Sequence, residues 1–374
     1  MKIAVNTRLL LTNRMEGIAR FIFETTKRMV LANPNIEFHF LFDRPYSDEF
    51  IFADNVIPHV VSPPSRHPVL WYLWFEKAVP RILKKYNIDV FFSGDMYMSL
   101  KTNVPTLLVS HDLNYLHYPK ALKWSHLKFL NYYFPKYHSA ADHIIAVSEY
   151  TKKDIINQYG IKKDKITVAY NATPEKFYPL DEKEKQAFRD KYTSGCPYFA
   201  YIGSLHPRKN VATLLLAFDK FKKLTNSNEK LILHGRLAFK TKKMLEIYEG
   251  MAYKSDVILQ NDNQCDIVDV LGASLSLCYV SLFEGFGIPI LEAFKSEVPV
   301  ITSNVTSMPE VAGDAAILVD PLNPDEIAEA MKEISVNESV RQQLIEKGKE
   351  RLQYFSWDKS AQIIFNKLKN LVKN

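Results

Sequence analysis

The sequence predicts an α/β protein with two doubly wound domains, each built on a mostly parallel sheet. The 374 residues are more than one hydrophobic core usually covers. Short apolar runs rich in Val, Ile and Phe alternate with longer amphipathic stretches almost from end to end, which is typical of β-α-β units. This alternation occurs once in each half of the chain, so we expect one sheet in each half.

The apolar runs define the expected strands, and a proline-containing charged stretch at 171–197 separates the two sets. The last helical pattern either completes the second domain or crosses back to the first. The expected strands are 2–6, 36–42, 89–93, 104–110, 143–147 and 166–169, then 198–203, 231–235, 257–260, 275–281, 298–302 and 316–319. The expected division is 1–172 for the first domain, 173–355 for the second and 356–374 for the last helix.

The net charge of +6 lies entirely in the first half. Residues 1–175 hold 22 Lys and Arg against 16 Asp and Glu, whereas the remainder holds 26 of each. The imbalance indicates that the first domain meets an anionic partner. We expect no nucleic-acid partner, because no helix-turn-helix, zinc-finger or RNP pattern accompanies the charge.

Two stretches of the first domain, 66–86 and 118–138, combine aromatic and basic residues. Three interpretations remain open for them. Each is a helix lying on an anionic membrane surface, a helix lining an acceptor groove, or a core helix whose cations extend to solvent.

Targeting, metal and cofactor motifs are missing from the sequence. The N-terminal segment has polar interruptions at Asn6 and Arg8, and no apolar run approaches the roughly 20 residues of a bilayer span. There is no CxxC pair, no Asp-x-Asp triplet and no Walker sequence. We therefore expect no metal and no cofactor in a cytoplasmic protein, at most peripheral at the inner face of the plasma membrane.

The most informative stretch is 275–294, in which a buried strand, a glycine-containing loop and a helix start follow one another. Glu284 lies at the strand end and Glu292 about one turn into the helix, so both carboxylates border one crevice and suit vicinal sugar hydroxyls. The purely structural alternative is that Glu284 is a loop charge and Glu292 an acidic residue of the first helical turn. The backbone amides expected at the helix N-terminus, where they suit a phosphate, are those of Phe286, Gly287 and Ile288.

The segment 198–210 opens the second domain with a strand, a loop and another helix start. Arg208 and Lys209 in this loop can reach a diphosphate held at the neighbouring helix N-terminus. The alternative is a solvated basic pair. Cations at a helix start oppose the helix dipole, which favours a functional reason for them.

Three positions of the first domain attract attention at strand ends. Gly17 follows the opening strand and starts an amphipathic helix, and His111 follows the run 104–110. Gly17 is as well explained as a turn glycine, and a histidine at a strand end is more often a packed structural residue than a ligand. Ser148 is predicted to be a helix N-cap, with direct ligand contact as the alternative.

Four segments together resemble the retaining glycosyltransferases of family GT4: AVSEYTKKDI, GSLHPRKN, SLFEGFGIPILEAF and VTSMPEVAGDAAILVDPLNPDEIAEAM. The resemblance covers almost the whole chain. It implies the GT-B fold, in which two Rossmann-like domains face each other across a cleft. The first domain is the acceptor side, the second binds the nucleotide sugar, and the last helix commonly packs back on the first.

The resemblance also implies roles for individual residues. Lys209, aided by Arg208, binds the donor diphosphate, Glu292 holds the ribose, and Glu284 sits against the donor sugar. His111 contacts the donor sugar near the reacting carbon. The remaining donor-binding positions that it implies are Gly17, Gly203, Ser204, Phe286, Gly287 and Ile288.

This chain departs from the family pattern at three places. Ser204 stands where the family often has arginine, His206 where relatives often carry glutamate, and the first-domain loop has one glycine instead of two. These departures affect the exact phosphate contacts and the identity of the donor.

The resulting expectation is a metal-independent retaining glycosyltransferase. It moves a hexose from a UDP- or GDP-sugar to a glycan or lipid-linked glycan. GDP-mannose is the preferred donor because the chain resembles bacterial mannosyltransferase-like members of the family. The alternatives are a sugar-nucleotide epimerase or hydrolase of the same fold, and a non-catalytic nucleotide-sugar-binding protein.

Overall fold

The chain forms two compact units, residues 1–171 with 356–374 and residues 172–355. The computed structural model describes residues 1–12, 15, 17–237, 241–260 and 265–373. The sequence-based boundary between 172 and 173 lies one residue from the observed one. Along the sequence, residues 172–355 are therefore inserted between the main part of the other unit and the last helix of that unit.

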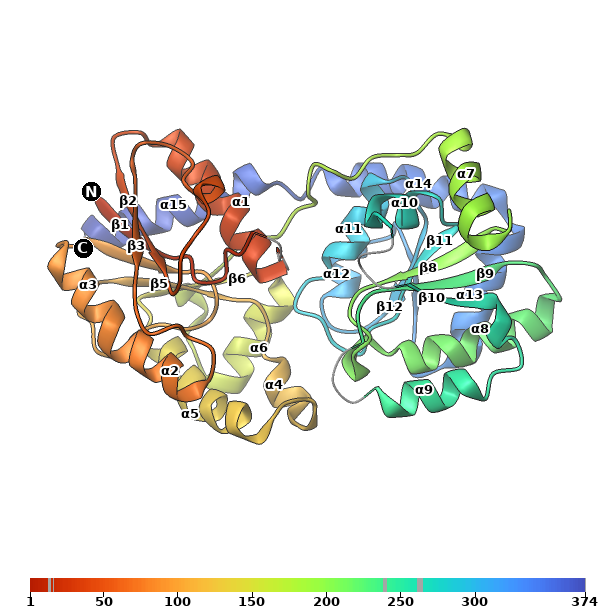
Figure 1. Cartoon of the computed structure of the whole chain (residues 1–374), viewed down its shortest axis with the longest axis horizontal. Helices are drawn as coiled ribbons and strands as arrows, with labels where there is room; N and C mark the ends of the chain where they lie inside the picture. Colours follow the sequence, from red (N-terminus) through yellow and green to blue (C-terminus); the bar gives the residue numbers. More distant parts are fainter. Residues whose placement is uncertain (13–14, 16, 238–240, 261–264, 374) are drawn as a thin grey trace. The chain divides into compact units, whose positions relative to one another are not determined.

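The first unit is a seven-stranded parallel sheet in the order β3-β2-β1-β4-β5-β6-β7. Figure 1 shows its strands and surrounding helices in red to yellow-green, with the last helix in blue. The strands are β1 (Lys2–Asn6), β2 (Glu37–Phe42), β3 (Val56–Val60), β4 (Val90–Ser93), β5 (Thr106–Ser110), β6 (His143–Ala146) and β7 (Ile166–Val168). The helices are α1 (Gly17–Ala32), α2 (Pro68–Leu73), α3 (Val79–Lys85), α4 (Asn114–His117), α5 (Trp124–Ala140), α6 (Glu149–Tyr159) and α15 (Trp357–Lys373).

Among the residues that the structure describes, β3 is the strand that the sequence pattern missed. It contains Pro58, which pairs with Phe40 of β2, and it lies at the edge of the sheet. Proline has no backbone N–H to donate and is therefore confined to such edges. The same residue that makes this segment look unlike a strand thus explains where the strand lies.

Helix α15 packs on the first unit, which answers the question that the sequence left open. Figure 1 shows α15 beside α1. The ring of Trp357 meets Phe21 of α1 edge-on, with centroids 6.0 Å apart. Arg28 of α1 pairs with Asp358 at 2.8 Å, and the Ser360 hydroxyl donates to the Tyr170 carbonyl at 2.6 Å.

The second unit is a six-stranded parallel sheet in the order β10-β9-β8-β11-β12-β13. Its strands are β8 (Tyr198–Ile202), β9 (Lys230–His234), β10 (Val257–Gln260), β11 (Ser276–Tyr279), β12 (Val300–Ser303) and β13 (Ile317–Val319). Its helices are α7 (Glu182–Thr193), α8 (Val211–Thr225), α9 (Lys242–Glu249), α10 (Ile267–Gly272), α11 (Ile288–Lys295), α12 (Met308–Ala312), α13 (Pro324–Val336) and α14 (Glu338–Leu352).

Strand β8 shows why these runs read as continuous apolar segments. Phe199 and Tyr201 belong to one core cluster, whereas Tyr198 and Ala200 belong to another. Successive side chains of a strand point to opposite faces, so both faces of the sheet are covered. Such burial places the polar groups available for chemistry in the loops at the strand ends.

Candidate functional site

The predicted site residues of the second unit lie on loops that leave one edge of its sheet. Strand β11 pairs in parallel with β8 through Ser276 and Phe199, and with β12 through Leu277 and Val300. The carboxyl ends of these three strands therefore meet at the same edge. The loops 203–210, 280–287 and 304–307 follow these ends and supply the side chains described below.

The loop after β8 begins at Gly203 and holds its cations in a short turn at Pro207–Lys209. Gly203 has a φ of +139°, a conformation that favours glycine. His206 accepts a hydrogen bond from the Arg208 N–H at 3.2 Å, so this departure from the family pattern caps the turn. The backbone N–H of Leu282 donates to the Arg208 carbonyl at 2.9 Å, which ties this turn to the loop after β11.

Three charged side chains, predicted from two separate segments, meet where these two loops come together. The Arg208 guanidinium lies 2.8 Å from Glu284 Oε2, and Lys209 Nζ lies 2.7 Å from Glu284 Oε1. The Glu284 side chain is only 9% exposed. Its burial raises its pKa, but the charges of Arg208 and Lys209 outweigh this effect and lower the pKa to about 2. Glu284 is thus an ionised carboxylate shared by two cations.

Tyr279 is a functional candidate that the sequence pattern does not reveal. Lys209 Nζ donates to the Tyr279 hydroxyl at 2.7 Å and lies 5.0 Å from the centre of its ring. Tyr279 is buried at the end of β11, and burial raises its pKa well above the usual value. In the sequence this tyrosine reads as one more core aromatic of a buried strand. Only the fold places its hydroxyl beside Lys209.

The loop after β11 is braced from the loop after β12. The Ser307 hydroxyl lies 2.9 Å from the Glu284 carbonyl and 2.8 Å from the Phe286 carbonyl. Gly287, with a φ of +111°, is the N-cap of α11. Phe286 itself is buried with its ring against Phe355, so this loop offers backbone rather than that side chain to a ligand.

The other predicted donor-binding positions occupy the same loops and helix. Ile288 is the first residue of α11, and Glu292 lies one turn further, half-buried. Ser204 follows Gly203, and its carbonyl accepts from the Tyr201 hydroxyl at 2.9 Å. The structure thus brings Arg208, Lys209 and Glu284 into contact, and gives the remaining positions their predicted places at the loop and the helix N-terminus.

The first unit carries the remaining predicted residues, His111 and Gly17. His111 follows β5; its Nε2 donates to the Gly94 carbonyl at 2.8 Å, and its ring meets Phe21 edge-on at 5.3 Å. Burial lowers the pKa of His111, so the imidazole is neutral at physiological pH. Gly17 is the exposed first residue of α1, and residues 13–14 and 16 of the loop before it lie outside the described part of the chain.

Ser148 is the predicted N-cap of α6, and the structure confirms this role. Its hydroxyl accepts from the Thr151 N–H at 3.0 Å. Such a bond satisfies one of the backbone donors that a helix start leaves open. Capping therefore accounts for Ser148 without a ligand.

The described residues contain neither a metal-binding cluster nor a membrane-spanning helix. Among them, His, Cys, Asp and Glu side chains do not form any group of three or more that is placed to hold a metal ion. None of the helices in the described ranges has both the length and the apolar character that crossing a bilayer requires.

Comparison with known families accounts for nearly the whole chain. Residues 15–176 match the model described as Glycosyltransferase Family 4, and residues 182–351 match the model described as Glycosyl transferases group 1. The chain is 25% identical over 373 residues to the O-antigen chain mannosyltransferase B of Escherichia coli, covering 96% of this chain and 97% of that one. It is 25% identical over 300 residues to the O-antigen chain mannosyltransferase RfbU of Salmonella typhimurium, covering 77% and 78%.

Solved structures agree with the fold. Anabaena HepE, crystallised in complex with UDP and glucose, superposes with a TM-score of 0.76 at 16% identity, covering 99% of both chains. WaaG, a glycosyltransferase of lipopolysaccharide biosynthesis, superposes with a TM-score of 0.75 at 14% identity, covering 98% of this chain and 99% of that one. These architectures, the consecutive family matches and the mannosyltransferase relatives show that the chain belongs to glycosyltransferase family 4 and has the GT-B fold.

Proposed function

We propose that this glycosyltransferase moves a hexose from a nucleoside diphosphate sugar to a glycan or lipid-linked glycan, with retention and without a metal ion. The observation that carries the proposal is the Arg208–Lys209 pair beside the loop that leads into the N-terminus of α11. Cationic side chains and backbone amides stabilise a departing diphosphate without a divalent ion.

In this reaction the bond between the anomeric carbon and the diphosphate breaks, and a bond to the acceptor oxygen forms on the same face of the sugar. The acceptor proton passes to an oxygen of the departing phosphate. Arg208 and Lys209 bind the diphosphate, Glu292 the ribose hydroxyls, and Glu284 the donor sugar.

The relatives favour GDP-mannose as the donor. The O-antigen chain enzymes of E. coli and Salmonella are named mannosyltransferases, whereas Anabaena HepE was crystallised with UDP and glucose. The test is a thermal-unfolding series with GDP, UDP and their sugars, with and without EDTA. At 100 times its dissociation constant a ligand adds about 2.7 kcal/mol, or about 5–10 °C for a unit of this size.

We expect GDP-mannose to give this shift and EDTA to leave it unchanged. A shift that requires a divalent cation would contradict the metal-independent mechanism. Incubation of the stabilising donor without acceptor then separates the alternatives. Rapid donor turnover alone would identify a hydrolase or an epimerase, and no turnover with any acceptor would indicate a non-catalytic binding protein.

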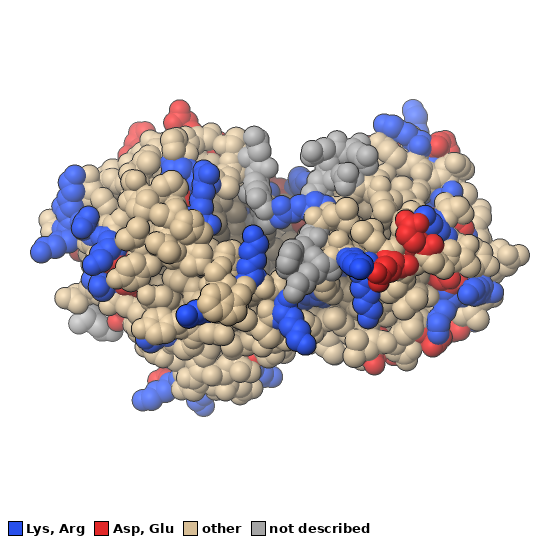
Figure 2. Space-filling model, turned by 60° about the horizontal axis from the view of Figure 1, so that its bottom comes forward, with Lys and Arg blue, Asp and Glu red and all other residues tan. Residues whose placement is uncertain are grey.

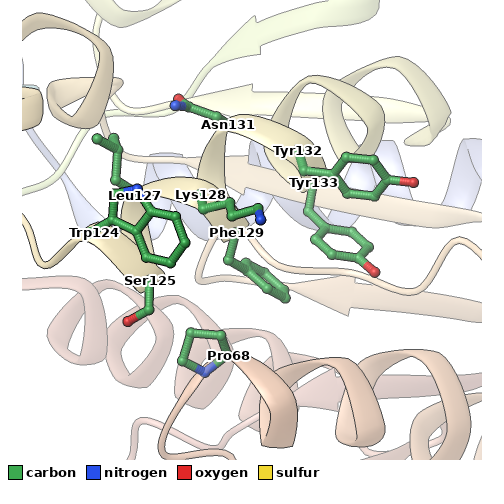
Figure 3. Close-up of a pocket in the computed structure, with 9 residues that line it drawn as sticks. All are labelled: Pro68, Trp124, Ser125, Leu127, Lys128, Phe129, Asn131, Tyr132 and Tyr133. Atoms are coloured by element: carbon green, nitrogen blue, oxygen red, sulfur yellow. The ribbon is translucent and has the colours of Figure 1, made fainter.

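We also propose that a face of the first unit contacts an anionic membrane at its cytoplasmic side. Exposed apolar side chains of α2 and α5 form this aromatic–basic face: Val69 is 63% exposed, Trp124 74% and Tyr132 57%. A groove of about 740 Å³ runs between the start of α2 and α5 (Figure 3). Lys128 lies over the Trp124 ring at 5.2 Å and Lys136 over the Tyr132 ring at 3.4 Å.

The charge of this face fits an anionic surface. Residues 55–75 and 113–141 contain no Asp or Glu. Figure 2 brings this side forward and shows Lys and Arg spread over the first unit with few acidic side chains. Aromatic side chains insert at a bilayer interface, and each cation adds about 1 kcal/mol near anionic lipid.

We expect the protein to sediment with phosphatidylglycerol-containing vesicles and much less with pure phosphatidylcholine. Replacing both Lys128 and Lys136 by alanine removes about 2 kcal/mol and lowers partitioning about 30-fold. The matched control is the pair Lys162→Ala and Lys163→Ala, two exposed lysines on the turn before β7. Equal binding of both double variants, or sedimentation independent of lipid charge, would contradict the proposed face.

A further inference from the structure

The contact between Glu284 and the two cations has a consequence for which nucleotides the site accepts. Arg208 and Lys209 each lie within 2.8 Å of one Glu284 oxygen. The same two side chains are the predicted ligands of the diphosphate. A carboxylate of this chain therefore already pairs with the cations that are proposed to bind the diphosphate.

Glu284 is a permanent competitor for these cations. Because Arg208 and Lys209 lower its pKa to about 2, the carboxylate keeps its charge throughout the physiological pH range. It also sits in a buried place, where charge interactions are screened less than at the surface. An incoming diphosphate must displace the Glu284 carboxylate from these cations and then lies close to its negative charge.

Lys209 has a second partner besides Glu284. Its Nζ donates to the buried Tyr279 hydroxyl at 2.7 Å, which is neutral because burial raises its pKa. The side chain of Arg208 likewise donates to the Phe283 carbonyl. These neutral contacts tie both cations to the second unit independently of Glu284.

We propose that Glu284 makes the site select a nucleotide sugar over the free nucleoside diphosphate. This inference rests on the proposed function, because it uses the donor sugar. Hydroxyls of the transferred sugar donate to the displaced carboxylate and compensate for its lost ion pairs. A free diphosphate has no such hydroxyls, and its exposed terminal phosphate carries an additional negative charge that Glu284 repels.

The same asymmetry favours release of the product. After transfer, the sugar no longer contacts Glu284, and the carboxylate is free to compete with the diphosphate for Arg208 and Lys209. The site thus holds the donor better than the nucleotide that remains after the reaction. Glu284 is in this sense a specificity residue as well as a sugar contact.

The test compares Glu284→Gln, which keeps the side-chain shape and removes the charge, with the wild-type protein. Dissociation constants for GDP, UDP, GDP-mannose and UDP-glucose are measured by titration calorimetry. We expect Glu284→Gln to bind the preferred free nucleoside diphosphate at least about tenfold more tightly, and the matching nucleotide sugar no more tightly than before. A residue that only binds sugar hydroxyls would leave the affinity for the free diphosphate unchanged.

The control is Glu292→Gln on the same helix-bearing segment, which we expect to weaken both ligands through the ribose. Glu284→Asp, which retracts the carboxylate by one methylene, serves if Glu284→Gln does not fold, and should tighten free diphosphate binding by a smaller factor. If the Glu284 variants bind the free diphosphate no more tightly than the wild-type protein, the inference is wrong but the proposed function is not affected. If the wild-type protein binds neither nucleotides nor nucleotide sugars, the proposed function fails and the inference fails with it.

Discussion

Replacing Lys209 by alanine is expected to lower turnover at least about 100-fold, because it removes one preorganised cation from the departing diphosphate. Lys209 is held by Glu284 and Tyr279 at 2.7 Å each, so its charge is already in place before the reaction. The measurement is the initial rate at which nucleoside diphosphate is released in the presence of donor and acceptor. The donor is the one that thermal unfolding identifies, and the acceptor is a glycan.

The control for this experiment is Lys223→Ala. Lys223 lies on α8 with a side chain that is 61% exposed and pairs only loosely with Asp219, at 3.7 Å. We expect its removal to change the rate less than twofold, since exposed ion pairs of this kind contribute little. Near-normal kinetics of a folded Lys209→Ala protein would show that the diphosphate is stabilised elsewhere.

Gly235→Ala is expected to lower the free energy of unfolding of the second unit by about 3 kcal/mol or more. Gly235 follows β9 with a φ of +150°, and a Cβ atom there would lie 2.0 Å from the Gly203 carbonyl oxygen. The loss combines backbone strain with an overlap that only a main-chain shift can relieve. Because Gly203 begins the loop that carries Arg208 and Lys209, the same shift disturbs the site.

Thermal unfolding measures this effect, and we expect the melting temperature of the second unit to fall by about 6–12 °C. Gly160→Ala is the comparison, because Gly160 also has a positive φ, +66°, but no heavy atom lies within 4 Å of its added Cβ. That variant should lose only the backbone preference of about 1–2 kcal/mol. Gly160 lies in the first unit, so the drop that Gly235→Ala causes in the second unit is compared with the drop that Gly160→Ala causes in the first, and a drop that is no larger would contradict the steric argument.

Much of the fold could be predicted because its strands are buried on both faces. Runs such as 198–202 are hydrophobic and buried at every position, so their composition and the turn residues that bound them identify them without further information. Strand β3 could not be predicted because Pro58 is unusual within a strand. Its pairing with β2 at the edge of the sheet, where proline is tolerated, becomes visible only in the fold. The fate of the last helix also depended on tertiary contacts, namely those of Trp357 and Asp358 with α1.

For the site, the sequence predicts the individual charged residues but not their contacts with one another. Glu284, Arg208 and Lys209 were each predicted from residue type and position at a strand end. Their mutual pairing was not, because it depends on the parallel neighbourhood of β8 and β11. Tyr279 was missed altogether, since a tyrosine within an apolar run carries no sign that its hydroxyl will face a lysine.

The return of α15 to the first unit constrains how the protein acquires its structure during synthesis. The ribosome delivers residues 1–171 first, yet the surface of α1 that receives Trp357 stays uncovered until the last helix emerges. The inserted second unit is delivered whole before that moment. Of the two units, the one whose synthesis starts earlier is consequently completed later, and shortening the chain before residue 357 would remove the ring that packs edge-on against Phe21.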